Sequence, residues 1–310
     1  MFRFGLASCR GPEPMTARSG PILVIGSSGQ LAQSLRAMGR EDVVCVGRPD
    51  ADLADPIKLA DLVAKMTPRL VLNAGGYTKV DPAETQTSEA FALNRDGPAT
   101  LARLCASADI PLIHISTDCV FDGRKEAPYT PEDLAEPINA YGRSKLAGEE
   151  AVALSCRKHL IVRVSWVFSE HADNFVRTML KIARQRDEIS VVRDQIGYPT
   201  YCPDLAAGLL EIAGQVLQPG FEDWGIYHLA GGSEVDRASM AEAIFAESRT
   251  IGGPAARVLP VLTQDYPTPA ERPLNARLDA GKANRVFGVA LPNWQIGLQK
   301  SVRVLVAQDS

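Results

Sequence analysis

The chain has 310 residues, which is longer than one average domain and leaves room for one large domain or two unequal ones. Its composition is that of an ordinary globular protein, with 45% hydrophobic residues, 23% charged residues and a formal net charge of −4. The acidic balance argues against nucleic acid as the main partner, and no apolar run is long enough to predict a membrane span. The six cysteines form no CxxC pair, so we expect reduced thiols in a cytoplasmic protein without a zinc site.

The first twenty residues contain no sustained hydrophobic stretch of the kind found in a signal peptide. We therefore predict a flexible leader over residues 1–20, with Met15 as the natural start. The folded part is expected to begin at Pro21.

From that point strands and helices alternate on short connections. The predicted strands are 22–25, 43–46, 70–72, 111–115 and 160–164. The predicted helices are a stretch that follows the first strand and ends at about residue 38, and the segments 56–65, 82–107 and 141–154. Continuous runs of isoleucine, valine and leucine are typical of strands buried on both faces of a parallel sheet. The pattern predicts an α/β fold of the Rossmann type, a doubly wound parallel sheet with right-handed crossovers.

The second half of the chain is richer in proline and glycine, and the alternation weakens after Val167. We interpret it as a smaller, mixed and loop-rich substrate-binding lobe. The dinucleotide-binding domain is placed at residues 21–168 and the substrate-binding lobe at 169–310, with some of the later segments returning to the sheet.

A glycine turn follows the first predicted strand, in the pattern Gly26-x-x-Gly29-x-x-Ala32. Gly26 lets the chain turn, Gly29 lets the backbone approach phosphates, and Ala32 keeps the helix close to the sheet. The N-terminus of the following helix offers unpaired N–H groups to a pyrophosphate. A plain strand-to-helix turn is the alternative interpretation.

The second predicted strand ends in Gly47-Arg48, where an acidic residue that binds ribose would otherwise be expected. An arginine there can pair with a 2′-phosphate, which favours NADPH over NADH. A solvated surface charge is the competing interpretation of Arg48. Asp52 and Leu53 are expected to border the adenine.

Tyr141 and Lys145 lie four residues apart and so share one face of a predicted helix. The lysine charge is expected to lower the tyrosine pKa, which would allow proton exchange with a substrate oxygen near neutral pH. An isolated pair of this kind is more often structural than catalytic. Here, however, a strand ending in Ser116-Thr117 precedes it, and these hydroxyls can hydrogen-bond the same carbonyl. The combination predicts a reductase site, with Thr117 or Ser116 orienting the carbonyl and Tyr141 donating the proton.

From about Pro21 to Asp279 the chain resembles the extended short-chain dehydrogenases, and among them most closely the dTDP-4-dehydrorhamnose reductase family. The strings that carry the resemblance are Gly26-Ser-Ser-Gly-Gln-Leu31, Asn73-Ala-Gly-Gly-Tyr-Thr78 with Val80-Asp81, Ser116-Thr-Asp-Cys-Val-Phe-Asp-Gly123, Tyr141-Gly-Arg-Ser-Lys-Leu-Ala-Gly-Glu149, Arg163-Val-Ser-Trp-Val167, Asn174-Phe175, Asp194-Gln-Ile-Gly-Tyr-Pro-Thr200 and Arg272-Pro-Leu-Asn275. The third and seventh are the most specific, whereas the first and fifth are shared by the wider superfamily.

The resemblance implies NAD(P)H-dependent reduction of the 4-keto group of dTDP-4-dehydro-L-rhamnose, with Thr117, Tyr141 and Lys145 as catalytic residues. The implied cofactor-binding residues are Gly26, Ser28, Gly29, Gln30, Leu31, Arg48, Asp52, Leu53, Asn73, Ala74, Gly75, Tyr77, Ser116, Tyr141 and Lys145. The implied substrate-binding residues are Asp118, Val120, Trp166, Asn174, Gln195, Thr200 and Arg272. For Trp166 a place in the core is the competing interpretation, and for Arg272 a surface ion pair. The expected partner is a nucleotide sugar, and a homodimer is left open.

Three positions depart from the family pattern. Cys119 stands where an aromatic residue is common, and Gly75-Gly76 replaces an alanine pair. Ser34 stands where some members have a glutamate that binds magnesium, so no metal is expected.

Two other functions compete with a reductase. A nucleotide-sugar dehydratase or epimerase would share the fold and the Tyr-Lys pair, but the dehydratases that resemble this chain have a glutamate in place of Cys119. The other is a catalytically silent regulatory subunit, of the type that binds methionine adenosyltransferase. The presence of Thr117, Tyr141 and Lys145 favours an enzyme.

Overall fold

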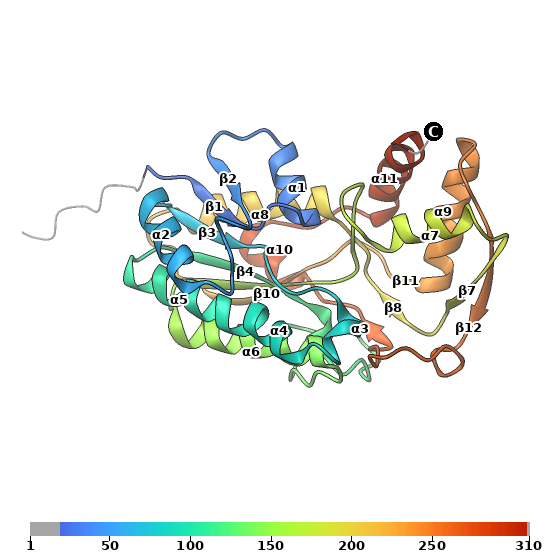
Figure 1. Cartoon of the computed structure of the whole chain (residues 1–310), viewed down its shortest axis with the longest axis horizontal. Coiled ribbons are helices and arrows are strands. Elements are labelled where there is room, and N and C mark those ends of the chain that lie inside the picture. The colour runs from blue at the N-terminus through green and yellow to red at the C-terminus, as the bar shows by residue number, and fades with distance from the viewer. Residues whose placement is uncertain (1–18, 309–310) are drawn as a thin grey trace, which may run out of the picture.

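The computed structural model describes residues 19–308. The leader expected over residues 1–20, with Met15 as the start, lies almost entirely outside these residues. A six-stranded parallel sheet forms the centre of the molecule, with the strand order β10-β5-β4-β3-β1-β2 (Figure 1). Its strands are β1 (Ile22–Ile25), β2 (Val43–Val46), β3 (Leu70–Asn73), β4 (Leu112–Thr117), β5 (His159–Val164) and β10 (Gly225–Leu229). The predicted doubly wound α/β fold is thus confirmed.

Helices cover both faces of this sheet, because its strands are apolar on both sides. In β1, Ile22 and Val24 join one hydrophobic cluster, whereas Leu23 and Ile25 join another across the sheet. The first cluster is closed by α1 (Gln30–Ala37), α8 (Cys202–Val216) and α10 (Gly281–Phe287). The second is closed by α2 (Pro56–Met66), α5 (Gly97–Ser107) and α6 (Ala140–Ser155), on the opposite side of the sheet in Figure 1.

The single helix predicted over residues 82–107 is wrong, because the segment is divided into shorter pieces. These are α3 (Val80–Ala83), α4 (Thr87–Phe91), a π-helical turn (Ala92–Asp96) and α5. Within the π turn the amide of Asn94 donates to the Tyr77 carbonyl at 3.0 Å and accepts from the Tyr77 backbone N–H at 2.8 Å. Pro98 lacks an N–H and follows this turn in α5, so α-helical hydrogen bonding is interrupted there.

A second lobe lies at one end of the sheet and is more helical than the proline and glycine content suggests (Figure 1). It consists of α7 (Phe175–Ala183), α9 (Arg237–Thr250), α11 (Trp294–Gln308) and the parallel pair β7 (Glu188–Val192) and β12 (Arg257–Val261). Apolar side chains of these elements form one cluster that includes Val176, Phe245 and Val302. Between the two halves of this lobe in the chain, β10 joins the central sheet and α8 packs on one face of it.

Short strands join the sheet to the second lobe. They are β6 (Val167–Phe168), β8 (Ile196–Gly197), β9 (Thr200–Tyr201), β11 (Val235–Asp236) and β13 (Asn275–Ala276). None of the helices within residues 19–308 combines the length and the apolar character needed to cross a membrane.

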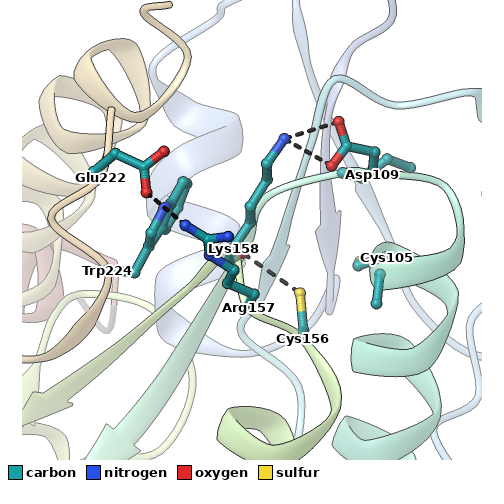
Figure 2. A pocket seen from close by; sticks show the side chains of 9 residues that line it. Cys105, Asp109, Cys156, Arg157, Lys158, Glu222 and Trp224 are labelled. Carbon is teal, nitrogen blue, oxygen red and sulfur yellow. Dashed lines mark hydrogen bonds and ion pairs between the residues drawn. The ribbon is translucent and has the colours of Figure 1, made fainter. Parts of the chain in front are cut away.

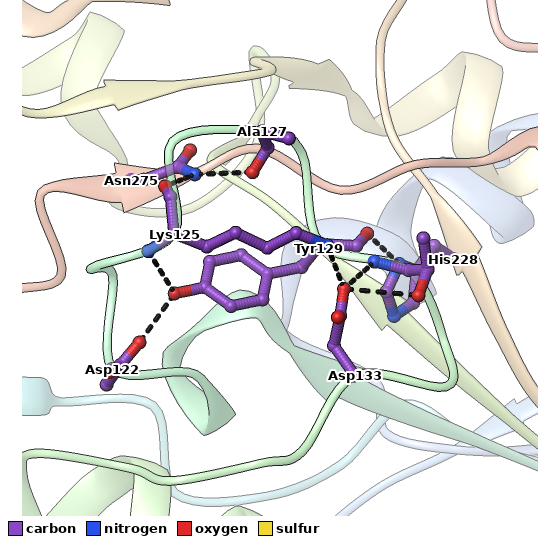
Figure 3. A network of polar contacts seen from close by, with 8 residues as sticks. Asp122, Lys125, Ala127, Tyr129, Asp133, His228 and Asn275 are labelled. Carbon is purple, nitrogen blue, oxygen red and sulfur yellow. Dashed lines mark hydrogen bonds and ion pairs between the residues drawn. The ribbon is translucent and has the colours of Figure 1, made fainter.

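A polar network fixes the loop that follows β4 (Figure 3). The Tyr129 hydroxyl donates to Asp122 at 2.5 Å and accepts the Lys125 backbone N–H at 3.1 Å. The Lys125 ammonium pairs with Asp133, and the Asn275 amide donates to the Lys125 carbonyl at 2.6 Å. The loop is therefore tied to β13, whose strand borders the site described next.

Candidate active site

A cleft of about 550 Å³ opens where the carboxyl ends of the central strands meet the second lobe. Open α/β sheets bind their ligands at this edge. The predicted site residues that line it are Gly29, Gln30, Leu31, Ala74, Gly75, Tyr77, Ser116, Thr117, Asp118, Tyr141, Lys145, Trp166, Asn174, Gln195 and Arg272. The cleft thus contains the end of the glycine turn, from Gly29 to Leu31, together with the predicted catalytic residues.

Some predicted site residues do not line the cleft: Gly26, Ser28, Arg48, Asp52, Leu53, Asn73, Val120 and Thr200. Asn73 and Leu53 lie beneath its floor. The buried amide of Asn73 accepts the Gly75 N–H at 3.2 Å, and a Cβ on Gly75 would come within 3.1 Å of Leu53. These two residues therefore shape the Gly75 loop from below.

The side chains of Val120 and Thr200 do not reach the cleft, although the family resemblance implies that they contact the substrate. Val120 is fully buried and packs in a small core with Phe121 and Tyr129. The Thr200 hydroxyl donates to the Tyr198 carbonyl at 3.2 Å and accepts the Gly231 N–H at 3.3 Å. Their predicted contact with the substrate stays a prediction that this cleft lining does not support.

The glycine turn has the shape needed by a dinucleotide. Gly26 has φ +127°, which residues with a side chain rarely adopt. Gly29 is the N-cap of α1, and a Cβ placed on it would meet nothing within 4 Å. No side chain caps α1, so its first N–H groups remain available to a phosphate. These features fit the pyrophosphate of a nicotinamide cofactor.

Arg48 lies exposed just beyond the end of β2, and no ion pair with a side chain of the described residues holds it. Its position outside the cleft lining leaves the guanidinium accessible from solvent. This placement is compatible with a 2′-phosphate at that end of the sheet.

Three polar groups are linked at the adjacent ends of β4 and β5. The Thr117 hydroxyl donates to Asp118 at 2.8 Å and accepts the Cys119 N–H at 3.2 Å. The Ser165 hydroxyl lies 3.0 Å from the other Asp118 oxygen. Burial raises the pKa of the Asp118 carboxyl, although the hydrogen bonds from Thr117 and Ser165 oppose the change.

Helix α6 carries the Tyr-Lys pair. Its N-cap is Asn139, whose side chain accepts the Gly142 N–H at 2.7 Å, so Tyr141 lies in the first turn. Lys145 follows one turn later and is only 6% exposed. Its ammonium donates to the Ile115 carbonyl at 2.6 Å, which anchors it to β4.

The pKa values of this pair differ from the sequence-based expectation. Burial raises the pKa of Tyr141, and Cys119 and Asp118 raise it further, whereas a hydrogen bond with Thr117 lowers it. Burial also lowers the pKa of Lys145 to about 8, against the opposing effect of Glu149. The expected lowering of the tyrosine pKa by Lys145 is therefore absent from this structure, in which the ammonium is held by the Ile115 carbonyl.

A buried ion pair supports this region from behind. The Arg163 guanidinium on β5 donates to Glu149 of α6 at 2.6 Å, and both side chains are 3% exposed. Ser116 donates a hydrogen bond to the same carboxylate. The pair thus joins α6, β4 and β5 at the level of the predicted catalytic residues.

Arg237 and Asn94 are among the residues of this region that sequence reasoning missed. Arg237, the first residue of α9, lines the cleft and stacks on Trp166. Asn94 donates to Ser144 of α6 at 2.9 Å and so links the π turn to the helix that carries Tyr141. An arginine at a helix N-terminus is an unusual choice that could have drawn attention, but the helix itself was not predicted.

A second hollow, of about 250 Å³, lies away from these groups (Figure 2). Lys158 pairs with Asp109 at 2.7 Å and Arg157 with Glu222 at 3.1 Å along its border. None of the predicted site residues lines it. Its exposed charges are paired with one another, so we assign it no role.

Known proteins resemble this chain over nearly its whole length. The family model described as the RmlD substrate binding domain matches residues 20–306. A dTDP-4-dehydrorhamnose reductase from Sinorhizobium fredii is 42% identical over 290 residues, which cover 93% of this chain and 98% of the relative.

Two solved structures extend this similarity to the fold. A dTDP-4-dehydrorhamnose reductase from Clostridium acetobutylicum superposes with a TM-score of 0.85 at 30% identity, covering 92% of this chain and 99% of that one. The corresponding enzyme of Bacillus anthracis, solved in complex with NADP, gives a TM-score of 0.82 at 30% identity, covering 91% of this chain and 98% of its own.

Proposed function

The chain belongs to the dTDP-4-dehydrorhamnose reductase family, and we propose that it reduces the 4-keto group of dTDP-4-dehydro-L-rhamnose to give dTDP-L-rhamnose. The observation that carries this proposal is the shared cleft, which brings Thr117, Tyr141 and Lys145 together with the glycine turn. A cofactor surface and a proton donor on one cleft are the two parts that a carbonyl reductase needs.

NADPH, when bound, supplies the hydride. Tyr141 donates the proton to the keto oxygen from its phenol, which stays protonated at neutral pH because burial raises its pKa. The hydroxyl of Thr117 orients the keto oxygen beside Tyr141. Lys145 holds the ribose next to the nicotinamide, and its anchor on the Ile115 carbonyl fixes its direction.

NADPH is the cofactor that the charge at the end of β2 favours. Arg48 is exposed there, and the chain offers no acidic residue at that position to bind a free ribose hydroxyl. Asp52 and Leu53 are the residues proposed to border the adenine, and Gly26, Ser28 and Ala74 those proposed to surround the phosphates and the nicotinamide side.

The dehydratase and epimerase alternatives need a further acid–base group beside the sugar. Cys119 occupies that position, and burial raises the pKa of its thiol, so it stays protonated and is a poor base. A silent regulatory subunit would need none of the catalytic residues. A simple carbonyl reduction therefore has the strongest support.

The direct test is to mix the purified protein with dTDP-4-dehydro-L-rhamnose and either NADPH or NADH, and to follow cofactor oxidation and the sugar product. We expect oxidation coupled to formation of dTDP-L-rhamnose, faster at low cofactor concentration with NADPH. Cofactor binding without turnover of this sugar would overturn the proposal.

A further inference from the structure

The guanidinium of Arg237 lies on the face of Trp166 in the second-lobe wall of the cleft. Its Cζ atom is 3.4 Å from the centroid of the indole ring and 5.0 Å from that of Phe175. Arg237 and both aromatic residues line the cleft. A guanidinium stacked in this way keeps its plane fixed, while the N–H groups at its edge remain free to bind a ligand.

The ring beneath it is itself held firmly. Trp166 has φ +45°, a backbone conformation that tryptophan rarely adopts, and a Cβ on Gly197 would come within 2.6 Å of the ring. Only a glycine at position 197 therefore leaves room for the indole where it lies. The fold places Trp166, and through it the plane of Arg237, in one orientation.

Arg237 lacks the partner that a cation in a cleft normally has. Among the ion pairs and hydrogen bonds of residues 19–308, none involves its guanidinium. Arg272, which lines the same cleft, contrasts with it because its guanidinium pairs with Asp81 at 2.8 Å. The backbone of Arg237 is fixed by a hydrogen bond from its N–H to the Gln195 carbonyl at 3.2 Å.

Three features make this position unfavourable for an unpaired cation. Arg237 is the first residue of α9, where the helix dipole repels positive charge. Burial and the neighbouring Arg272 together lower its pKa to about 10, against the opposing effect of Asp118. A bound anion would relieve the dipole repulsion, the desolvation and the repulsion between the arginines together.

We propose that Arg237 binds the diphosphate of the nucleotide-sugar substrate, with Trp166 as the surface that orients its guanidinium. The identification of the anion rests on the proposed function. A phosphate pair presents oxygens that a guanidinium can bind in bidentate fashion, which a lysine could not do. Because Arg237 and Asp118 interact electrostatically across the same cleft, the bound diphosphate would set the position of the sugar beside Thr117 and Tyr141.

The competing explanation is that Arg237 only supports the Trp166 ring. Arg237→Met separates the two, because methionine preserves apolar contact with the indole but carries no charge and no donors. Arg237→Lys keeps the charge and loses the planar fork. Arg249→Met is the matched control, since Arg249 is an exposed arginine of the same helix outside the cleft.

The experiment measures binding of dTDP, thymidine and inorganic pyrophosphate by calorimetry to the protein saturated with NADP⁺, so that the glycine turn is already filled. We expect Arg237→Met to weaken the binding of dTDP about ten- to hundredfold and to leave the binding of thymidine unchanged. Arg237→Lys should give an intermediate loss, and Arg249→Met none.

Equal dTDP affinity in the wild type and Arg237→Met would overturn the inference, and so would a wild type that binds neither dTDP nor pyrophosphate. Loss of NADP⁺ affinity in place of dTDP affinity would also overturn it, because the guanidinium would then serve the cofactor's phosphates. If the wild type reduces no 4-keto sugar nucleotide but dTDP binding still depends on Arg237, the proposed function fails and the anion site stands.

Discussion

The loop around Tyr129 and the cleft around Tyr141 use the same kinds of side chain in opposite ways. In the Tyr129 network the phenol, the ammonium of Lys125 and the carboxylates of Asp122 and Asp133 bind one another (Figure 3). In the cleft, Arg237 has no ion-pair partner among residues 19–308, and the Tyr141 phenol borders open space.

The difference distinguishes polar groups that stabilise the fold from those that await a ligand. Buried polar groups in proteins are normally satisfied by neighbours, because an unsatisfied group costs free energy. A group that is held rigidly but left unpaired in a cleft is thus a candidate for ligand binding. The following predictions test this division.

The largest effect is expected from the buried Arg163–Glu149 pair. Replacing Arg163 by Met leaves the Glu149 carboxylate buried without its partner, so the free energy of unfolding should fall by about 3–5 kcal/mol. The matched control is Arg157→Met, because Arg157 and Glu222 form an ion pair with side chains that are 85% and 70% exposed (Figure 2). Its loss should cost less than about 1 kcal/mol in urea unfolding. A similar decrease in the free energy of unfolding for the two variants would contradict the account.

A smaller effect, a loss of activity that grows with pH, is expected from the titration of Lys145. Its pKa in the free enzyme is lowered to about 8, so the ammonium is present below that pH and is lost above it. If the charge holds the ribose, kcat/KM should fall about tenfold per pH unit on the alkaline side, while Tyr141 stays protonated. Lys145→Arg keeps its charge and should flatten that decline. An unchanged alkaline decline in this variant would exclude Lys145 as the titrating group.

The smallest effect is expected at Arg48, which like Arg237 has no side-chain ion-pair partner among the described residues. Arg48→Gln should weaken the binding of NADPH about tenfold and leave the binding of NADH nearly unchanged, because only NADPH carries the 2′-phosphate. Fluorescence titration with each cofactor measures the two dissociation constants and so their ratio. An equal loss of affinity for NADPH and NADH would show that Arg48 does not distinguish the two cofactors.

The sequence was a good guide wherever local patterns decide structure. The apolar run Ile22–Ile25 and the glycine turn after it predict a buried strand and the start of a helix, and both are present. Phosphate binding at this turn stays a prediction. The sequence did not predict the π turn, because that turn depends on the tertiary hydrogen bonds between Asn94 and Tyr77.

The candidate site was predictable where its residues lie in contiguous motifs. Thr117, Tyr141 and Lys145 meet as expected, since each follows from a strand end or a helix spacing. The pKa values of the pair were not predictable, because burial in the folded protein raises that of Tyr141 and lowers that of Lys145. Arg237 was missed because its relation to Trp166 arises only when the second lobe folds against the sheet.

The most direct test of the account removes one phenolic oxygen from each region. Tyr129→Phe should lower the free energy of unfolding by about 1–3 kcal/mol, because Asp122 loses its donor, and should leave turnover intact. Tyr141→Phe should lower kcat about 10²- to 10⁴-fold with cofactor binding and stability retained. Retained reduction of the keto sugar in Tyr141→Phe would contradict the central claim that this phenol donates the proton.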